Sequence, residues 1–105
     1  MPRGPMNPYT TSVADGRKVT VTAGTRVALS ATSVPVISVD VTAETNNTGV
    51  VVVGGVTCVE AVATRRGTPL NAGDTKTYLN VDLKDVYIDA AVDTDGVTFD
   101  YVGAP

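Results

Sequence analysis

The sequence contains no histidine, no tryptophan, one cysteine (Cys58) and one phenylalanine among its 105 residues. Without histidine the usual general base and the commonest metal ligand are missing. This excludes a Ser-His-Asp triad, a Cys-His pair and a zinc site built from several Cys and His residues. One cysteine cannot form an internal disulfide, and its apolar neighbours predict a small buried side chain. Only carboxylates, lysines, tyrosines and the backbone remain for catalysis, so we expect no enzyme, no metal and no cofactor.

Charged residues are also scarce. They make up 18% of the chain, with a net charge of −3, whereas a free-standing surface favours roughly 25–35%. The negative charge disfavours nucleic acid as a partner, and no apolar run is long enough to cross a membrane. The beginning, "MPRGPMNPY", has no apolar signal-peptide core, which predicts synthesis and retention in a cytoplasm. The low charge indicates that part of the surface is covered in an assembly.

Valine and threonine dominate instead, and from Val19 onward apolar and polar residues alternate with a period of two. The alternation places the following residues together on shared faces: Val19 and Val21; Val27 and Leu29; Ile37, Val39 and Val41; Thr77, Leu79 and Val81; Val86, Ile88, Ala90 and Val92; Val97, Phe99 and Tyr101. Turn signals separate these runs at residues 14–16, 23–25, 46–49, 54–55, 71–74 and 93–96. The pattern predicts an all-β fold, an antiparallel β-sandwich or jelly roll of about eight strands over residues 16–105. Residues 1–15, rich in Pro and Gly, are predicted to form an extended N-terminal arm.

Two polar motifs contain groups of the kind that bind ions or charged partners. Asp93-Thr94-Asp95-Gly96 offers oxygen atoms beside a glycine, as calcium loops do. It lacks the third acidic position and the final glutamate of an EF-hand loop, however, and Asp-Gly between alternating runs is a strong hairpin signal. Arg65-Arg66-Gly67 is the only basic cluster, and in an acidic chain it predicts an exposed turn or a contact to an acidic neighbour.

The stretch "NTGVVVVGG" places Val50 to Val53 in one strand. Neighbouring side chains of a strand point to opposite faces, so only one pair can face the core. Each fully covered valine contributes on the order of 1.5–2 kcal/mol, so the second pair also needs a cover. We expect another subunit to provide it; a loop of the same chain is the alternative.

Tyr78 and Tyr87 are predicted on outer faces, where tyrosine suits subunit packing or a weak carbohydrate contact. The predicted interface combines the arm, one pair of valines, the basic cluster and these tyrosines: Pro2, Arg3, Pro5, Met6, Pro8, Tyr9, Val51, Val53, Arg65, Arg66, Tyr78 and Tyr87.

Several motifs follow one another in the second half of the chain. "NNTGVVVVGG" is a strand that ends in Val-Gly. The segment "GTPLNAGDTKTYLNVDLKDVYIDAAVDTDGVTFDYV" then has a Pro-Leu-x-x-Gly-Asp turn, an acidic-Leu-x-Asp crossover, a Tyr-Ile strand and a Gly-Val-Thr-aromatic strand. With the upstream "TRVALSATSVPVISVDVTAET", these motifs resemble small structural proteins of tailed bacteriophages, from about residue 25 to residue 102. Val52 stands where those proteins often carry an aromatic residue, and no catalytic residue is implied.

The resemblance implies a virion protein, made in the host cytoplasm and placed on the capsid surface as a decoration or cement protein. Its partners are then the major capsid protein and copies of itself, in a homo-oligomer such as a trimer, with the arm extended over a neighbouring subunit. Two other settings stay open: a component of the head–tail junction, and a tail- or fibre-associated adhesive module that binds host-surface glycans. Nucleic acid and membrane are not expected as partners.

Overall fold

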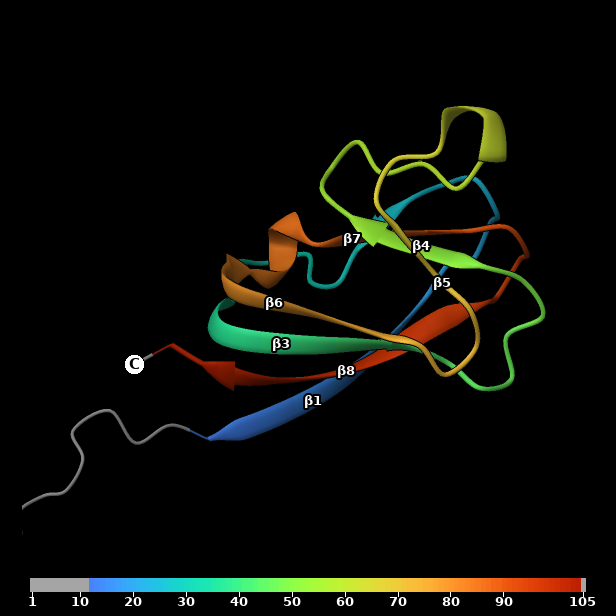
Figure 1. Cartoon of the computed structure of the whole chain (residues 1–105). Coiled ribbons are helices and arrows are strands. Elements are labelled where there is room, and N and C mark those ends of the chain that lie inside the picture. Colours follow the sequence, from blue (N-terminus) through green and yellow to red (C-terminus); the bar gives the residue numbers. More distant parts are fainter. Residues whose placement is uncertain (1–11, 105) are drawn as a thin grey trace, which may run out of the picture.

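The computed structural model describes residues 12–104, which form two antiparallel sheets of four strands packed face to face (Figure 1). Sheet A has the strand order β1-β8-β3-β6 and sheet B the order β2-β7-β4-β5. The strands are β1 (Val13–Val19), β2 (Val27–Ala28), β3 (Pro35–Ala43), β4 (Val51–Gly54), β5 (Thr68–Leu70), β6 (Thr75–Asp82), β7 (Tyr87–Ala90) and β8 (Gly96–Gly103). Two short 3-10 turns, η1 (Val62–Thr64) and η2 (Leu83–Asp85), lie in the connections.

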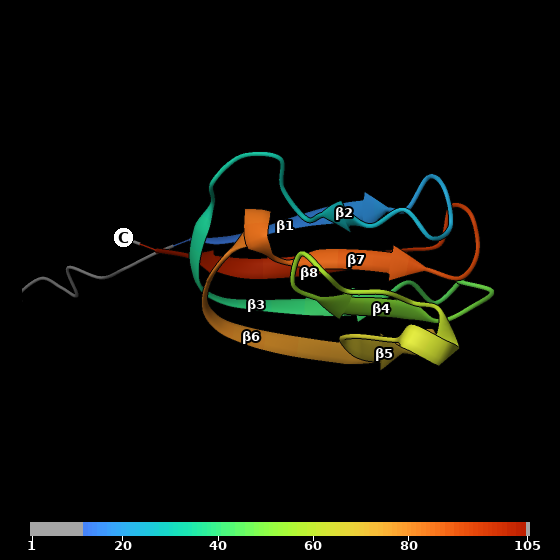
Figure 2. The ribbon, with the colours of Figure 1, turned by 90° about the horizontal axis from the view of Figure 1, so that it is seen from above.

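The order in which the strands pair shows how the chain is rolled up. β1 pairs with β8, β2 with β7, β3 with β6, and β4 with β5, all antiparallel. Seen from above, the two sheets run across the molecule in parallel series: β1, β8, β3 and β6 in sheet A correspond in turn to β2, β7, β4 and β5 in sheet B (Figure 2). This wrapping of an eight-stranded hairpin into two sheets is the jelly-roll arrangement. The predicted all-β sandwich of about eight strands is confirmed.

The core lies between the sheets. Its members are the inward-facing apolar side chains of both sheets and of the connections between them: Leu29, Val36, Val39, Val41, Ala43, Val51, Val53, Leu70, Leu83, Val86, Ile88, Ala90, Val97 and Phe99. Small β-branched side chains suit this closely spaced, pleated interior.

The first strand begins earlier than the sequence pattern predicts. β1 starts at Val13, so residues 13–15 belong to the domain and not to an arm of residues 1–15. The turn predicted at residues 14–16 is wrong, because Gly16 lies inside β1 opposite Phe99. A Cβ atom at Gly16 would lie 2.5 Å from the Phe99 ring, so this ring fills the space where a side chain would stand. β1 also ends earlier than predicted, at Val19. Val21, predicted to share a strand face with Val19, is therefore outside the strand and exposed.

Two local irregularities change which residues face inward. In β3 the register to β8 shifts between Val36 and Ser38, so Val36 is buried and Ile37 is 39% exposed. In β6, Asn80 has a positive φ of 55°, which interrupts the alternation. As a result Tyr78 packs against the core and Leu79 is 66% exposed, the reverse of the prediction.

Buried and partly buried aspartates hold the connections at both ends of the sandwich. At one end Asp95 accepts hydrogen bonds from the backbone N–H groups of Thr48 and Gly49. At the other end Asp82 accepts from the N–H groups of Val34 and Lys84. Carboxylates thus satisfy backbone donors that have no strand partner.

Candidate functional site

All of the side chains from Val51 to Val53 in β4 are covered from within the chain. Val51 and Val53 belong to the core, and Val52, on the opposite face, is also fully buried. The cover over Val52 is the connection of residues 55–67, here called the cover loop, which folds back above β4 (Figure 1). A Cβ atom at Gly67 would lie 2.7 Å from Cγ1 of Val52. The prediction that another subunit covers these valines, with Val51 and Val53 as interface residues, is therefore wrong, and the alternative of a loop of the same chain is correct for Val52. Val50, predicted in the same strand, lies directly before β4 and is half-buried.

Polar contacts fasten the cover loop to sheet B. Asp89 of β7, predicted to face outward, is only 2% exposed and accepts a hydrogen bond from the Glu60 N–H at 2.8 Å. Arg26 donates to the Cys58 carbonyl at 3.3 Å, and Arg65 donates to the Glu60 carbonyl at 3.0 Å. The Arg65 guanidinium also lies 3.6 Å from the Glu60 carboxylate. Arg65 therefore stabilises its own loop.

Cys58 belongs to the cover loop and is buried, as predicted. Burial raises the pKa of its thiol to about 11, and the nearby negative charge of Asp89 acts in the same direction. A thiol with so high a pKa is protonated at neutral pH and is a poor nucleophile.

The remaining predicted interface residues lie in different places. Tyr78 points toward the core, and burial raises the pKa of its hydroxyl. Tyr87 lies half-buried in β7, and Arg66 is exposed. The role of Tyr78, Tyr87 and Arg66 as interface contacts stays a prediction. Six of the predicted residues fall outside the described residues 12–104: Pro2, Arg3, Pro5, Met6, Pro8 and Tyr9.

On the outer face of sheet A, the strand register arranges exposed side chains in rows. Val13, Val102, Ser38 and Leu79 stand opposite one another across the four strands. Val13 is 71% exposed and Leu79 is 66% exposed. We call Val13, Val102 and Leu79 the apolar row.

Carboxylates form the next row. Asp15 of β1 stands opposite Asp100 of β8, and Asp100 stands opposite Asp40 of β3. We call these three residues the acidic row. Asp40 accepts a hydrogen bond from the Thr77 hydroxyl at 2.5 Å. Like charges placed directly opposite one another destabilise a sheet, so this row is unfavourable for the isolated fold.

Beyond the acidic row the face becomes hydroxyl-rich. Arg17, Thr98, Thr42 and Thr75 stand opposite one another, and the Thr42 and Thr75 hydroxyls are 2.8 Å apart. Arg17 forms an ion pair with Glu44, which raises the pKa of the guanidinium through a hydrogen bond and through charge attraction. Arg17 is thus engaged by Glu44 rather than by the acidic row.

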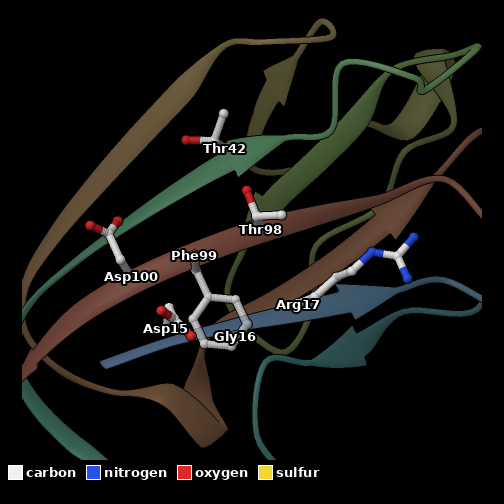
Figure 3. A pocket seen from close by; sticks show the side chains of 7 residues that line it. All are labelled: Asp15, Gly16, Arg17, Thr42, Thr98, Phe99 and Asp100. Carbon is white, nitrogen blue, oxygen red and sulfur yellow. The ribbon is translucent and has the colours of Figure 1, made fainter. Parts of the chain in front are cut away.

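A shallow hollow of about 500 Å³ lies on this face. In Figure 3, Thr98 and Asp100 project from one side of β8 and Phe99 from the other. The lining residues come from β1, β3 and β8: Asp15, Gly16, Arg17, Thr42, Thr98, Phe99 and Asp100. The hollow offers hydroxyls, carboxylates and one guanidinium, and it lacks a buried polar group that could bind a ligand tightly.

Sequence reasoning did not identify this face. Asp15, Asp40 and Asp100 lie far apart in the sequence, and only the register between β1, β8 and β3 brings them together. The alternation of "FDYV" and "SVDV" does place Asp100 and Asp40 on outer faces, which is the one signal present in the sequence.

Asp93, Thr94 and Asp95 lie in the connection between β7 and β8, and Gly96 begins β8, in agreement with the predicted turn. Its carboxylates bind the chain itself: Asp93 accepts a hydrogen bond from the Ala23 N–H at 2.7 Å, and Asp95 accepts one from the Gly49 N–H at 2.8 Å.

Residues 12–104 contain no group of three or more His, Cys, Asp or Glu side chains arranged to hold a metal ion. Nor does this part of the chain contain a helix long and apolar enough to span a bilayer.

Comparisons of the chain with protein-family models, with curated proteins and with solved structures found no match.

Proposed function

We propose that this chain is a structural protein of a tailed-phage virion, a capsid decoration or cement protein. In this role it binds the major capsid protein on the outside of the head and contacts copies of itself. The motifs of residues 25–102 are one support for this proposal. The jelly roll is compatible with it, but this fold hosts both capsid and lectin domains and does not decide between them.

The observation that carries the proposal is the outer face of sheet A. An apolar row, exposed at Val13 and Leu79 and half-buried at Val102, stands beside an unfavourable acidic row on a face four strands wide. Apolar surface with a polar rim marks protein interaction surfaces. The valines of β4 no longer contribute, because the chain covers them itself.

Binding to heads tests the proposal. Heads of the encoding phage, assembled while the gene for this chain is disrupted, are mixed with purified chain and sedimented. We expect saturable co-sedimentation and a higher temperature of head disruption. Val13→Ser with Leu79→Ser should weaken binding, whereas Val62→Ser, which changes an equally exposed valine in η1, should not. A chain that stays in the supernatant at saturating head concentration contradicts the proposal.

A second candidate, an adhesive module for host-surface glycans, is favoured by the hollow. Its carboxylates and threonine hydroxyls are groups that hydrogen-bond to sugar hydroxyls. Calorimetric titration with purified host polysaccharide should then give saturable heat that Asp100→Ala reduces. An absence of heat at millimolar sugar removes this candidate.

A further inference from the structure

We propose that the outer face of sheet A accepts residues 1–11 of a second copy of this chain. This inference rests on the proposed function for its setting, since it names the contact through which copies on a shell would be joined. The contact itself involves only two copies of the chain, so it can be tested without heads.

The accepting surface consists of the apolar row and the acidic row, which are adjacent in the strand register. Val13 and Leu79 at the two edge strands are 71% and 66% exposed, with Val102 between them. In the next row Asp15 and Asp100 pair through their backbones, and their carboxylates form no side-chain hydrogen bond within residues 12–104. A segment that binds this face should therefore be both apolar and cationic.

Residues 1–11, "MPRGPMNPYTT", have this composition. They contain Met6 and Tyr9, three prolines, and Arg3 as their only charged residue. Proline-rich segments are already extended, so they lose little conformational entropy on docking. An arginine fork fits one or two carboxylates, so Arg3 is the natural partner for Asp15 and Asp100.

The direction of the chain favours a second copy over the same copy. β1 is an edge strand of sheet A and begins at Val13, within the apolar row. A return onto the same face needs a tight reversal directly before Val13. Of residues 9–12, "YTTS", only Ser12 is of a type common in turns, whereas Tyr9, Thr10 and Thr11 are aromatic or β-branched residues that favour extended backbone.

The length of the segment allows it to reach a neighbour. Eleven residues span at most about 36–40 Å when extended. Four strands of a sheet are only about 14 Å across, from the first strand axis to the last. The segment is long enough to leave its own sheet edge and cross the face of an adjacent copy.

The energetics predict a weak contact that becomes effective when copies are held together. The acidic row repels itself, and a cation placed on it relieves this repulsion, so charge should decide which segment binds. A short segment buries little area, so free copies should associate only at high concentration. Copies held side by side on a shell have a high effective concentration, which strengthens such a contact.

A charge swap in the full-length chain tests the pairing. Arg3→Glu changes the segment, and Asp15→Lys with Asp100→Lys changes the acidic row. Each variant should weaken self-association about tenfold in a sedimentation-velocity concentration series, and combining all three changes should restore most of it. Asp85→Lys, which reverses an exposed charge in η2 away from the face, is the matched control and should associate like the parent chain.

Mixing the two variants tests whether the contact is between copies. The Arg3→Glu chain keeps an intact face, and the Asp15→Lys/Asp100→Lys chain keeps an intact segment. Their mixture should associate more strongly than either alone, with melting temperatures confirming that both are folded. If the parent chain is monomeric at every concentration up to about 1 mM, or if Arg3→Glu associates like the parent, the inference is wrong.

Head binding separates this inference from the proposed function. If Arg3→Glu loses head binding but keeps self-association, the segment contacts the shell and the inference fails while the proposed function stands. If the charge swap behaves as expected but no variant and no parent chain binds heads, the proposed function fails and the inference stands.

Discussion

Asp82 shows how a single carboxylate can hold two connections. Its oxygens accept hydrogen bonds from the Ser33 hydroxyl and from the N–H groups of Lys84 and Val34. These bonds, first of all the one from Ser33, lower the pKa of Asp82 below its ordinary value of 3.8. The connection before β3 and the turn η2 are thereby joined at one end of the sandwich.

The lowered pKa of Asp82 predicts a pH dependence of stability. Because the folded pKa is below 3.8, the contribution of Asp82 is fully present above that pH and is lost as the pH falls through the folded pKa. Asp82→Asn should lower the melting temperature at pH 7 by a few degrees and flatten its decline below pH 4. Thermal unfolding by circular dichroism measures both effects. The exposed Asp85→Asn is the control, and an equal loss in both variants at pH 7 would contradict the role given to Asp82.

The thiol of Cys58 should not react with alkylating reagents in the folded chain. Its side chain is buried, and its pKa of about 11 compares with an ordinary value of 9.0. At pH 8 this difference alone lowers the thiolate fraction about 100-fold, and burial blocks access as well. Iodoacetamide should therefore label the protein only after unfolding in urea, as followed by mass spectrometry. Rapid labelling of the native chain would show that the cover loop opens readily.

At the scale of elements, β4 and its cover loop form one unit. β4 is buried on both faces because the loop returns over Val52, and Gly67 at the end of the loop makes this possible. Gly67 has φ of 108°, and a Cβ atom there would also lie 2.7 Å from the Val53 carbonyl oxygen. A side chain at this position meets both backbone strain and a steric clash.

Gly67→Ala should therefore destabilise the chain more than a glycine replacement that meets strain alone. Gly24 is the matched control, because its φ is 83° and nothing lies within 4 Å of the position of a Cβ atom. We expect a loss of about 1 kcal/mol for Gly24→Ala from the left-handed backbone. For Gly67→Ala we expect a further 1–3 kcal/mol, approximately, from overpacking. Urea unfolding measures both, and equal losses would mean that the loop does not pack on β4 as described.

At the scale of the whole molecule, the two sheets bury a complete core within residues 12–104. Removal of residues 1–11 should then leave the melting temperature within about 2 °C of that of the full chain at micromolar concentration, because a typical domain shifts by several degrees per kcal/mol. Self-association at high concentration should fall in the same variant. A large loss of stability in dilute solution would mean that the segment completes the fold of its own copy.

Much of the fold followed from the sequence alone. The all-β class, the approximate number of strands, the turn at residues 93–96 and the inward direction of Val39, Val41, Ile88, Val97 and Phe99 are properties of the period-two alternation. These features depend on local geometry, since successive side chains of a strand must point to opposite faces. The burial of Cys58 also followed, from its apolar neighbours.

Only the tertiary structure decided the features that depend on residues far apart in the chain. The Phe99 ring fills the side-chain space at Gly16, which lies inside β1. The irregularity in β3 exposes Ile37, and the one at Asn80 reverses the predicted sides of Tyr78 and Leu79. The cover loop buries Val52, and the strand register assembles the acidic row. Alternation assigns a residue to one side of its own strand. It carries no information on what covers that side, because the cover comes from another part of the chain.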